Sequence, residues 1–285
     1  MQVELLKFPA EDGLIMSGLL YRSGRANKTA IVSIFGMTGD FFSSARNEEL
    51  CNAANRNGID VFLAGNRGMG AITPFKDKKG RKFYIGTVME KFEECLFDIG
   101  GALRLLRGLG YTKFFLVGHS TGCQKALYYQ YKRKDLKIKG IVFIAPMDDH
   151  NIAKQKDIGQ KFAKAVAFAR KMVNQGKGDM ITPTWISHYS AKRFLSYADE
   201  KKPEARLFNY DSDLKEFGSL RCPTLTIIGS REEHLTKPVR THIRILQSAA
   251  NGKFTSVVIN GANHGFRGRE KELGRAIIGW CRKFA

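Results

Sequence analysis

Residues 118–122 read Gly-His-Ser-Thr-Gly, directly after the apolar run 113–117 and directly before a stretch of helical character, 123–134. The pattern G-x-S-x-G rarely falls by chance at such a junction, so it predicts a sharp strand-to-helix turn. Such a turn is strained and its flanking positions must be small, which explains the two glycines. The stretch therefore predicts a nucleophile elbow that presents Ser120; the alternative is a glycine-rich turn that merely ends a strand.

Length and composition favour one large α/β domain with an insertion, because the chain has 285 residues and 43% of them are hydrophobic. The first residues lack the features of a signal peptide, and no run approaches the roughly 18 apolar residues of a membrane span. We therefore expect a cytoplasmic protein without stable membrane insertion.

The cysteines are five in number and show no C-x-x-C spacing. This argues against a disulfide framework or a zinc site and predicts reduced, mostly buried thiols.

The charge balance is strongly basic, with 47 Lys and Arg against 27 Asp and Glu and a net charge of +20. Such a field could attract anionic substrates, nucleic acid or acidic lipids. The basic residues are spread along the chain, however, and the only dense cluster is 76–82. Because no nucleic-acid-binding motif accompanies them, we interpret the charge as a solvated surface and expect no nucleic-acid partner. The sequence does not indicate an oligomeric state.

The chain begins with a hairpin and then alternates strands with helices. The hairpin joins 3–8 to 14–21 through Asp12-Gly13, a tight-turn signal. Six later runs are apolar throughout, as in strands that are buried on both faces of a parallel sheet. These runs are 30–35, 59–64, 114–117, 138–145, 224–228 and 255–259. We predict an α/β fold whose mostly parallel central sheet carries helices on both faces.

One helix of this fold is predicted after residue 87. Thr87-x-x-Glu90 has the form of a capping box, and apolar residues then recur on one face as far as Leu106, before Gly108. That face should pack against the sheet.

A helical insertion interrupts the alternation. About 70 residues separate Pro146 from the next apolar strand. Within them, apolar residues recur at helical spacing opposite lysines: Ile158, Phe162, Ala165, Ala169 and Met172. We predict a helical cap at 151–217, inserted between two parts of one core, 1–150 and 218–285. The cap is rich in aromatic residues: Trp185, Tyr189, Phe194, Tyr197, Phe208 and Tyr210. They either hold the cap together or face a substrate pocket beneath it.

A serine nucleophile needs a base to remove its proton, and the base needs a third group to orient it. His264 is the predicted base, because it lies in a small-residue loop between Gly261 and Gly265, ahead of the final helix. His119 should point away from Ser120 and pack. The remaining histidines are expected at the surface or in the cap: His150, His188, His234 and His242.

The predicted orienting acid is Glu232, which follows the strand that ends at Gly229. The chain order serine, acid, histidine suits such a triad, and glutamate can serve in place of aspartate. Glu233 is the adjacent alternative. Asp148 and Asp149, which follow another strand, are a third option.

The negative charge that develops on the reacting oxygen needs fixed donors. Phe35-Gly-Met-Thr-Gly39 follows a predicted strand, and its glycines permit a close turn. We predict an oxyanion hole formed by the backbone N–H groups of Met37 and Thr121. The alternative for 35–39 is an ordinary strand-end loop.

With these motifs the chain resembles the α/β-hydrolase superfamily over nearly its whole length. The resemblance rests on four segments in the expected order: Phe35-Gly-Met-Thr-Gly, Gly118-His-Ser-Thr-Gly, Gly229-Ser-Arg-Glu and Gly261-Ala-Asn-His. More finely, 118–124 is similar to a branch that includes siderophore-esterase-like hydrolases. The chain departs from the family at two positions: Phe35 replaces a histidine often found before the oxyanion glycine, and Glu232 replaces the commoner aspartate.

The resemblance and the motifs together predict a serine esterase that cleaves a small-molecule carboxylic ester through an acyl-enzyme. The predicted catalytic residues are Ser120, His264 and Glu232, and the predicted oxyanion donors are Met37 and Thr121. This chemistry needs no cofactor and no metal. The same scaffold would also suit a thioesterase, lactonase, peptidase or C–C hydrolase, and a non-catalytic small-molecule-binding protein is a further alternative. Substrate-binding residues are not predicted; Arg67 could attract an anionic group, but it is better interpreted as a brace for its loop.

Overall fold

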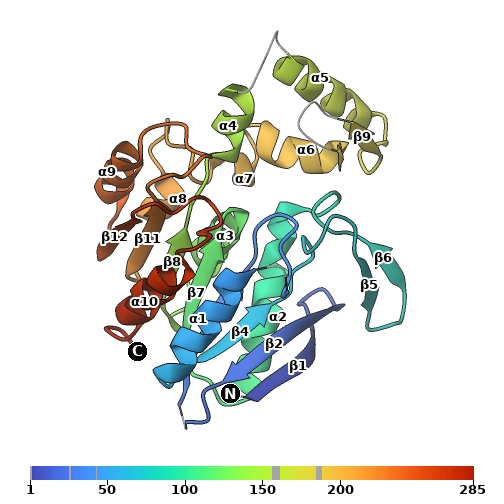
Figure 1. The fold of residues 1–285 in the computed structure, drawn as a ribbon. Coiled ribbons are helices and arrows are strands. Elements are labelled where there is room, and N and C mark those ends of the chain that lie inside the picture. Colours follow the sequence, from blue (N-terminus) through green and yellow to red (C-terminus); the bar gives the residue numbers. More distant parts are fainter. Residues whose placement is uncertain (1, 26, 43, 156–160, 184–187) are drawn as a thin grey trace.

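A computed structural model describes residues 2–25, 27–42, 44–155, 161–183 and 188–285. Within them a ten-stranded sheet runs in the order β12-β11-β8-β7-β3-β4-β2-β5-β6, and β1 pairs with β2 (Figure 1). The strands are β1 Gln2–Pro9, β2 Leu14–Arg22, β3 Thr29–Ile34, β4 Asp60–Ala64, β5 Pro74–Asp77, β6 Lys82–Tyr84, β7 Lys113–His119, β8 Ile138–Ile144, β11 Thr224–Gly229 and β12 Phe254–Ile259. Neighbours from β4 through β12 are parallel, and the pairs that involve β1, β2, β5 and β6 are antiparallel. The predicted hairpin and the mostly parallel sheet are therefore confirmed.

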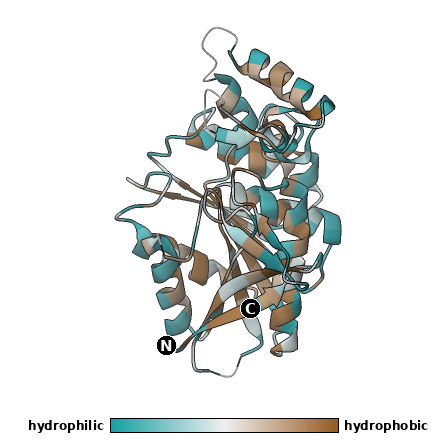
Figure 2. Cartoon of the chain, turned by 90° about the vertical axis from the view of Figure 1, so that its right-hand side faces the viewer, coloured by the Kyte–Doolittle hydropathy of each residue, from teal (hydrophilic) through white to brown (hydrophobic). Residues whose placement is uncertain are grey.

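Helices cover both faces of the sheet, as the all-apolar strands predict. Phe114 and Leu116 of β7 belong to one buried cluster, and Phe115 and Val117 belong to the cluster on the opposite face. The first cluster lies beneath α2 (Cys95–Gly108) and α3 (Thr121–Arg133), and the second beneath α1 (Ala45–Arg56) and α10 (Glu270–Cys281). Figure 2 shows the hydrophobic strands running between helices whose outer faces are hydrophilic. The α/β-hydrolase arrangement of layers follows.

The segment between β8 and β11 lies above the sheet in Figure 1. Its elements are α4 Asp149–Gln155, α5 Lys161–Asn174, β9 Ile181–Pro183, β10 His188–Ser190, α6 Ala191–Ala198, α7 Pro203–Arg206 and α8 Lys215–Gly218. Phe162 and Ala169 of α5 are buried in a separate small core with Phe194 and Tyr197. Phe208, in contrast, packs into the core of the sheet. Ile158 and Trp185 lie outside the described residues, and the division of the chain at 151–217 stays a prediction.

The predicted capping box is wrong, because its two side chains have tertiary partners. α2 begins at Cys95 after the 3-10 turn η1 (Phe92–Glu94). Thr87 Oγ1 donates to the carbonyl of Gly68 at 2.6 Å and accepts from Thr38 N–H at 2.6 Å. Glu90 forms a buried ion pair with Lys125 Nζ of α3 at 2.7 Å. The two residues therefore tie a loop to the rest of the fold and do not start a helix.

A buried arginine connects the segment above the sheet to that loop. Arg193 of α6 donates to both carboxylate oxygens of Glu204, at 2.6 and 2.9 Å, and its Nε donates to the carbonyl of Thr87 at 3.2 Å. Neither charged side chain has exposed surface. Because breaking the pair would leave a buried charge without a partner, the pair holds α6 to α7 (Pro203–Arg206), and the hydrogen bond to Thr87 joins α6 to the loop of the core.

All five cysteines are unpaired, and only Cys222 is not fully buried. No helix among residues that the structure describes combines the length and the apolar character needed to cross a membrane.

His242 lies in the interior, so its predicted surface position is wrong. It belongs to α9 (Val239–Ala249), has no exposed surface and stacks on Tyr210 with ring centroids 3.9 Å apart. Its Nε2 accepts from the backbone N–H of Lys237 at 3.2 Å. Burial, together with the Lys237 charge, lowers the pKa of His242 from 6.5 to about 4.

Because the unfolded chain binds a proton at His242 more readily than the folded chain does, stability should fall as the pH falls from 6.5 towards about 4. The loss attributable to this residue should reach up to about 3 kcal/mol. Urea unfolding of the wild type and of His242→Gln, at about pH 7 and again at about pH 5, measures the loss of unfolding free energy between the two pH values. The variant should lose less stability than the wild type between the two pH values; an equal loss would contradict the assignment.

Candidate active site

Ser120 occupies a strained turn between β7 and α3. Its backbone has φ 55° and ψ −130°, a conformation that costs a non-glycine residue of order 1–3 kcal/mol and that tends to occur at functional sites. The backbone thus has the geometry of the elbow that the sequence predicts, and Ser120 stands at its tip.

Three glycines make this turn possible, because a Cβ atom at any of them would meet neighbouring atoms. At Gly118 it would lie 2.4 Å from the carbonyl oxygen of Gly122, and at Gly122 it would lie 2.2 Å from that of Ile34. At Gly36 it would lie 2.9 Å from Cβ of Ser120. The residues two positions before and two positions after Ser120, and the second residue after β3, must therefore be small.

Gly122→Ala should destabilise the protein by about 1–3 kcal/mol, because the new methyl group forces β3 and α3 apart. Gly279→Ala is the matched control, since Gly279 also lies in a helix and its Cβ would meet nothing within 4 Å. The control should be neutral or stabilising by up to about 1 kcal/mol. Urea unfolding measures both variants, and similar values for the two would contradict the close packing at the elbow.

His264 and Glu232 lie in contact, as predicted for a base and its orienting acid. His264 Nδ1 is 2.9 Å from Oε1 and 3.0 Å from Oε2 of Glu232. The Glu232 side chain has no exposed surface and also accepts from the backbone N–H of His234 at 3.0 Å. Because the carboxylate can only accept, His264 Nδ1 carries a hydrogen, which leaves Nε2 as the basic nitrogen of the neutral ring.

The other candidate acids have different partners. Glu233 accepts from the backbone N–H of His264 at 2.9 Å. Desolvation acts to raise the pKa of Glu233, but backbone hydrogen bonds, this one first among them, and the charges of His234 and His264 together hold the pKa below its usual value. Asp148 binds Asn151 and the backbone of Tyr210, and Asp149 accepts from Gln124 Nε2 at 2.8 Å. Of the four carboxylates, Glu232 alone is hydrogen-bonded to the His264 ring.

His119 and His234 are two residues whose part in the site the sequence analysis missed. The rings of His119 and His234 each lie 4.8 Å from the ring of His264, measured between centroids. His119 Nε2 is 2.9 Å from the carbonyl oxygen of His264 and must donate to it, since a carbonyl only accepts. Burial, followed by the charges of Arg46 and His264, holds the pKa of His119 well below its usual value. A neutral His119 therefore fixes the backbone of His264 instead of packing away from the site.

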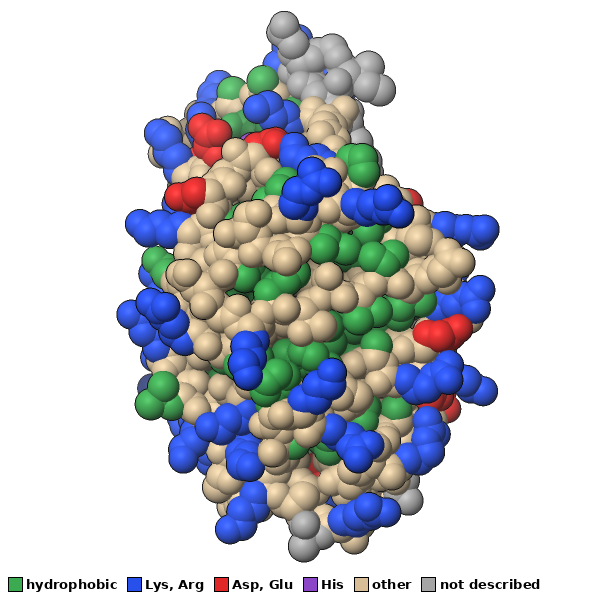
Figure 3. Space-filling model, turned by 90° about the vertical axis from the view of Figure 1, so that its left-hand side faces the viewer, with side chains coloured by type: hydrophobic (Ala, Val, Ile, Leu, Met, Phe, Trp, Pro, Cys, Tyr) green, Lys and Arg blue, Asp and Glu red, His purple; other side chains and the backbone are tan. Residues whose placement is uncertain are grey.

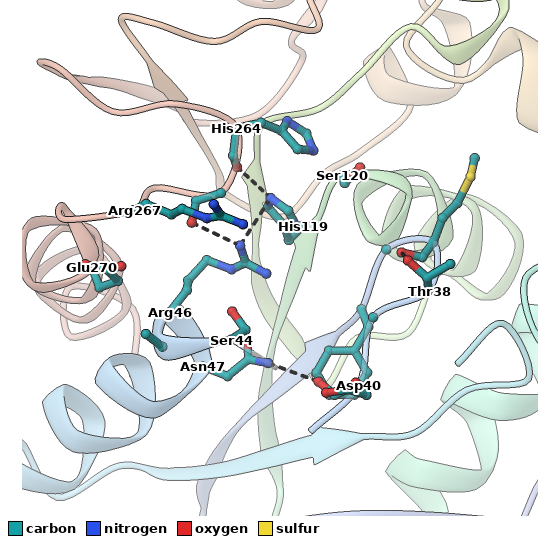
Figure 4. A pocket seen from close by; sticks show the side chains of 16 residues that line it. Thr38, Asp40, Ser44, Arg46, Asn47, His119, Ser120, His264, Arg267 and Glu270 are labelled. Atoms are coloured by element: carbon teal, nitrogen blue, oxygen red, sulfur yellow. Dashed lines mark hydrogen bonds between the residues drawn. The ribbon is translucent and has the colours of Figure 1, made fainter. Parts of the chain in front are cut away.

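Ser120 and His264 line one cavity, but the Ser120 hydroxyl is hydrogen-bonded elsewhere. Figure 4 shows the His264 ring and Ser120 at the same end of this cavity. Among the described residues, the Ser120 hydroxyl donates to Met147 Sδ at 3.2 Å and forms no hydrogen bond with His264. Catalytic hydrogen bonds often tighten only when substrate binds, so the pair would form if the Ser120 hydroxyl left Met147 and met the His264 ring.

The two predicted oxyanion donors also lie side by side. Met37 N–H points to Thr121, where it donates to the side-chain Oγ1 at 2.8 Å. Thr121 is fully buried at the first position of α3. The Thr121 hydroxyl thus engages the donor that an oxyanion would need. Tyr189, from β10, approaches the same loop, with its hydroxyl 3.6 Å from Met37 Sδ.

The cavity has a volume of about 480 Å³. None of its described lining residues comes from 151–217, so, of the two alternatives for the cap aromatics, these residues do not favour the one in which they face the pocket. The wall consists of Phe35, Gly36, Met37, Thr38, Gly39, Asp40, Ser44, Ala45, Arg46, Asn47, His119, Ser120, His264, Gly265, Arg267 and Glu270. The cavity is therefore built by the loop at 35–40, the start of α1, the elbow, the loop that carries His264 and the first residue of α10.

Arg67 does not line this cavity. Its guanidinium is buried and forms ion pairs with Asp12, Glu94 and Asp98. The interpretation of Arg67 as a structural brace agrees with these contacts.

Comparison with known sequences gives one family. The family described as "Protein of unknown function (DUF1749)" matches residues 102–281, more than half of the chain. The chain belongs to the DUF1749 family. No protein of curated function matches the DUF1749 chain in sequence.

Solved structures show the fold of this DUF1749 protein to be that of the α/β-hydrolases. Est1E from Butyrivibrio proteoclasticus, solved with bound ferulic acid, has a TM-score of 0.70 and 15% identity over 97% of this chain and 98% of its own. The Pyrococcus furiosus esterase Pf2001 has a TM-score of 0.62 and 15% identity over 99% and 91%. A Paleococcus ferrophilus monoacylglycerol lipase has a TM-score of 0.61 and 20% identity over 100% of both chains.

The matched DUF1749 span contains Ser120, Glu232 and His264, whereas the loop at 35–39 precedes it. Within the part of the chain that the structure describes, no group of three or more His, Cys, Asp and Glu side chains could hold a metal ion.

Proposed function

We propose that this DUF1749 protein is a serine hydrolase that cleaves a carboxylic ester through an acyl-enzyme. The observation that carries the proposal is the hydrogen bond from His264 to the buried carboxylate of Glu232. His264 lines the same cavity as Ser120, which occupies a strained turn. A base that is oriented by a carboxylate, beside a serine held out of its helix, is the arrangement that nucleophilic catalysis requires.

In the first half-reaction, Ser120 Oγ attacks the ester carbonyl while His264 Nε2 takes its proton. Glu232 stabilises the imidazolium that forms and keeps the ring in position. Collapse of the tetrahedral intermediate breaks the bond to the alcohol, which leaves with the proton from His264. In the second half-reaction water attacks the acyl-enzyme, again with His264 as the base, and the acid is released.

The oxyanion would be bound by the backbone N–H groups of Met37 and Thr121. Because Met37 N–H now donates to the Thr121 hydroxyl, that hydroxyl must turn away, or the oxyanion must replace it, before both donors act together. In this structure the contact with the Thr121 hydroxyl satisfies the partly buried N–H of Met37.

An ester substrate also agrees with the structural neighbours, which include an esterase and a monoacylglycerol lipase. Thioesters, lactones, amides and activated C–C bonds could react at the same groups. The contacts of the Ser120 hydroxyl with Met147 and of Met37 with Thr121 favour a second candidate, a protein that binds a small molecule without turnover.

Ser120→Ala separates these two candidates. The variant should keep the fold, because alanine removes only a hydroxyl, and should lose hydrolysis of 4-nitrophenyl butyrate by at least about 10³-fold in kcat/KM. Circular dichroism checks the fold, and release of 4-nitrophenolate measures the rate. Hydrolysis by the purified variant at the wild-type rate would rule out Ser120 as the nucleophile.

Glu232→Gln should lower kcat for the same ester by about 10³- to 10⁴-fold, because an amide neither stabilises the imidazolium nor selects the correct tautomer. Glu233→Gln is the matched control. Its amide oxygen can still accept from the backbone of His264, so the loss should stay below about tenfold. If the two variants had equal activity, or if Glu233→Gln were the more damaged, the assignment of the acid would be wrong.

A further inference from the structure

Two arginines line the wall of the cavity that holds Ser120 and His264: Arg46, in the first turn of α1, and Arg267, in the loop after His264. From their placement we infer that the substrate of the proposed hydrolase carries a carboxylate beside its ester, and that Arg46 binds this carboxylate. The inference rests on the proposed function for the reaction, but the anion site itself is independent of turnover.

Arg46 has few hydrogen-bond acceptors. A guanidinium offers five N–H donors. One of its nitrogens, Nη1, lies 3.4 Å from the carbonyl oxygen of Gly265 and 3.4 Å from Nε2 of His119. The second contact is not a hydrogen bond, because His119 Nε2 already carries the hydrogen that it donates to His264. Among the described residues, Arg46 is thus left with one long hydrogen bond.

Arg46 also lacks a negative partner. No carboxylate among the described residues lies within ion-pair distance of its guanidinium, whereas Arg67 has three such partners and Arg193 has two. Figure 4 shows the Arg46 side chain reaching from α1 towards the middle of the cavity.

The surroundings of Arg46 make its isolated charge unfavourable. Burial lowers the pKa of Arg46 to about 10, against the opposing influence of Cys123 and Glu270. Arg46 remains a cation at neutral pH. A partly desolvated charge without a partner raises the free energy of the protein, and a bound anion would lower it. A carboxylate suits the site because it can accept two parallel N–H bonds from a guanidinium.

The acids on the cavity wall do not supply this partner. Asp40 accepts from the backbone N–H of Phe42 at 2.7 Å, and Glu270 accepts from that of Gly268 at 3.1 Å. Neither forms an ion pair with Arg46 or Arg267. These carboxylates are held by their own loops.

The wider charge distribution supports the same substrate class. Arg267 is exposed and so adds a second cation within reach of solvent. The chain carries a net charge of +20, and Figure 3 shows a face on which Lys and Arg dominate the charged side chains. A field of this sign raises the local concentration of anionic substrates and speeds their encounter.

Matched esters test the inference. The monomethyl and dimethyl esters of succinate, glutarate and adipate differ in one charge, and proton release at constant pH gives kcat/KM for each. The wild type should prefer the monoester of at least one of the three acids, and Arg46→Gln should lower the ratio of monoester to diester by about tenfold or more. Arg46→Lys, which keeps the charge but loses the planar fork, should retain part of the preference and serves if Arg46→Gln does not fold.

Arg275→Gln is the control, because Arg275 is an exposed arginine of α10 that does not line the cavity. It should leave the ratio unchanged. A wild type that prefers the diester of all three acids, or a preference that survives in Arg46→Gln, would overturn the inference.

Binding to Ser120→Ala separates this inference from the proposed function. Isothermal titration of that variant with each of the three monoesters should show binding of at least one, which the added Arg46→Gln change weakens by about tenfold or more. Such binding without hydrolysis of any ester by the wild type would support the anion site and refute the hydrolase. Hydrolysis of diesters without binding of the monoester would support the hydrolase and refute the anion site.

Discussion

The site depends on one steric constraint: β3, β7 and the start of α3 approach so closely that side chains cannot fit between them. Atoms added at Gly118 or Gly122 would lie within 2.4 Å of a backbone oxygen. This approach forces Ser120 to the strained φ of 55° and lifts its side chain out of the helix that begins at the next residue. It also brings the N–H of Met37 to the first turn of that helix, so the proposed nucleophile and the proposed oxyanion donors owe their positions to the same close packing.

A second set of contacts fixes the histidine. Glu232 binds its ring, Glu233 its backbone N–H and His119 its backbone oxygen, so the loop that carries His264 is held from three sides. Each partner comes from the end of a parallel strand, β11 or β7. Because the carboxyl ends of parallel strands meet at one edge of the sheet, the fold gathers these groups without long loops.

Local patterns in the sequence predicted the residues whose roles follow from chain order and strand ends. The elbow, five strands buried on both faces and the contact between His264 and Glu232 belong to this group, whereas β12, predicted as a sixth buried strand, lies at the edge of the sheet and leaves Val258 exposed. Tertiary partners account for the failures: Thr87 and Glu90 bind distant groups and do not cap a helix, and His242 is buried against Tyr210, which lies more than 30 residues away in sequence. The contact of His119 with His264 and the place of Arg46 on the cavity wall were missed for the same reason, since they follow from where side chains meet in space.

The central claim is that the Ser120 hydroxyl is a nucleophile activated by His264. Covalent labelling with a fluorophosphonate tests it most directly, because the reagent needs no knowledge of the substrate and reacts with activated serines. Peptide mass spectrometry of the labelled wild type should place one adduct on Ser120, and His264→Ala should abolish labelling while keeping the fold. A folded wild type that remains unlabelled, or an adduct on another residue that persists in Ser120→Ala, would contradict the account.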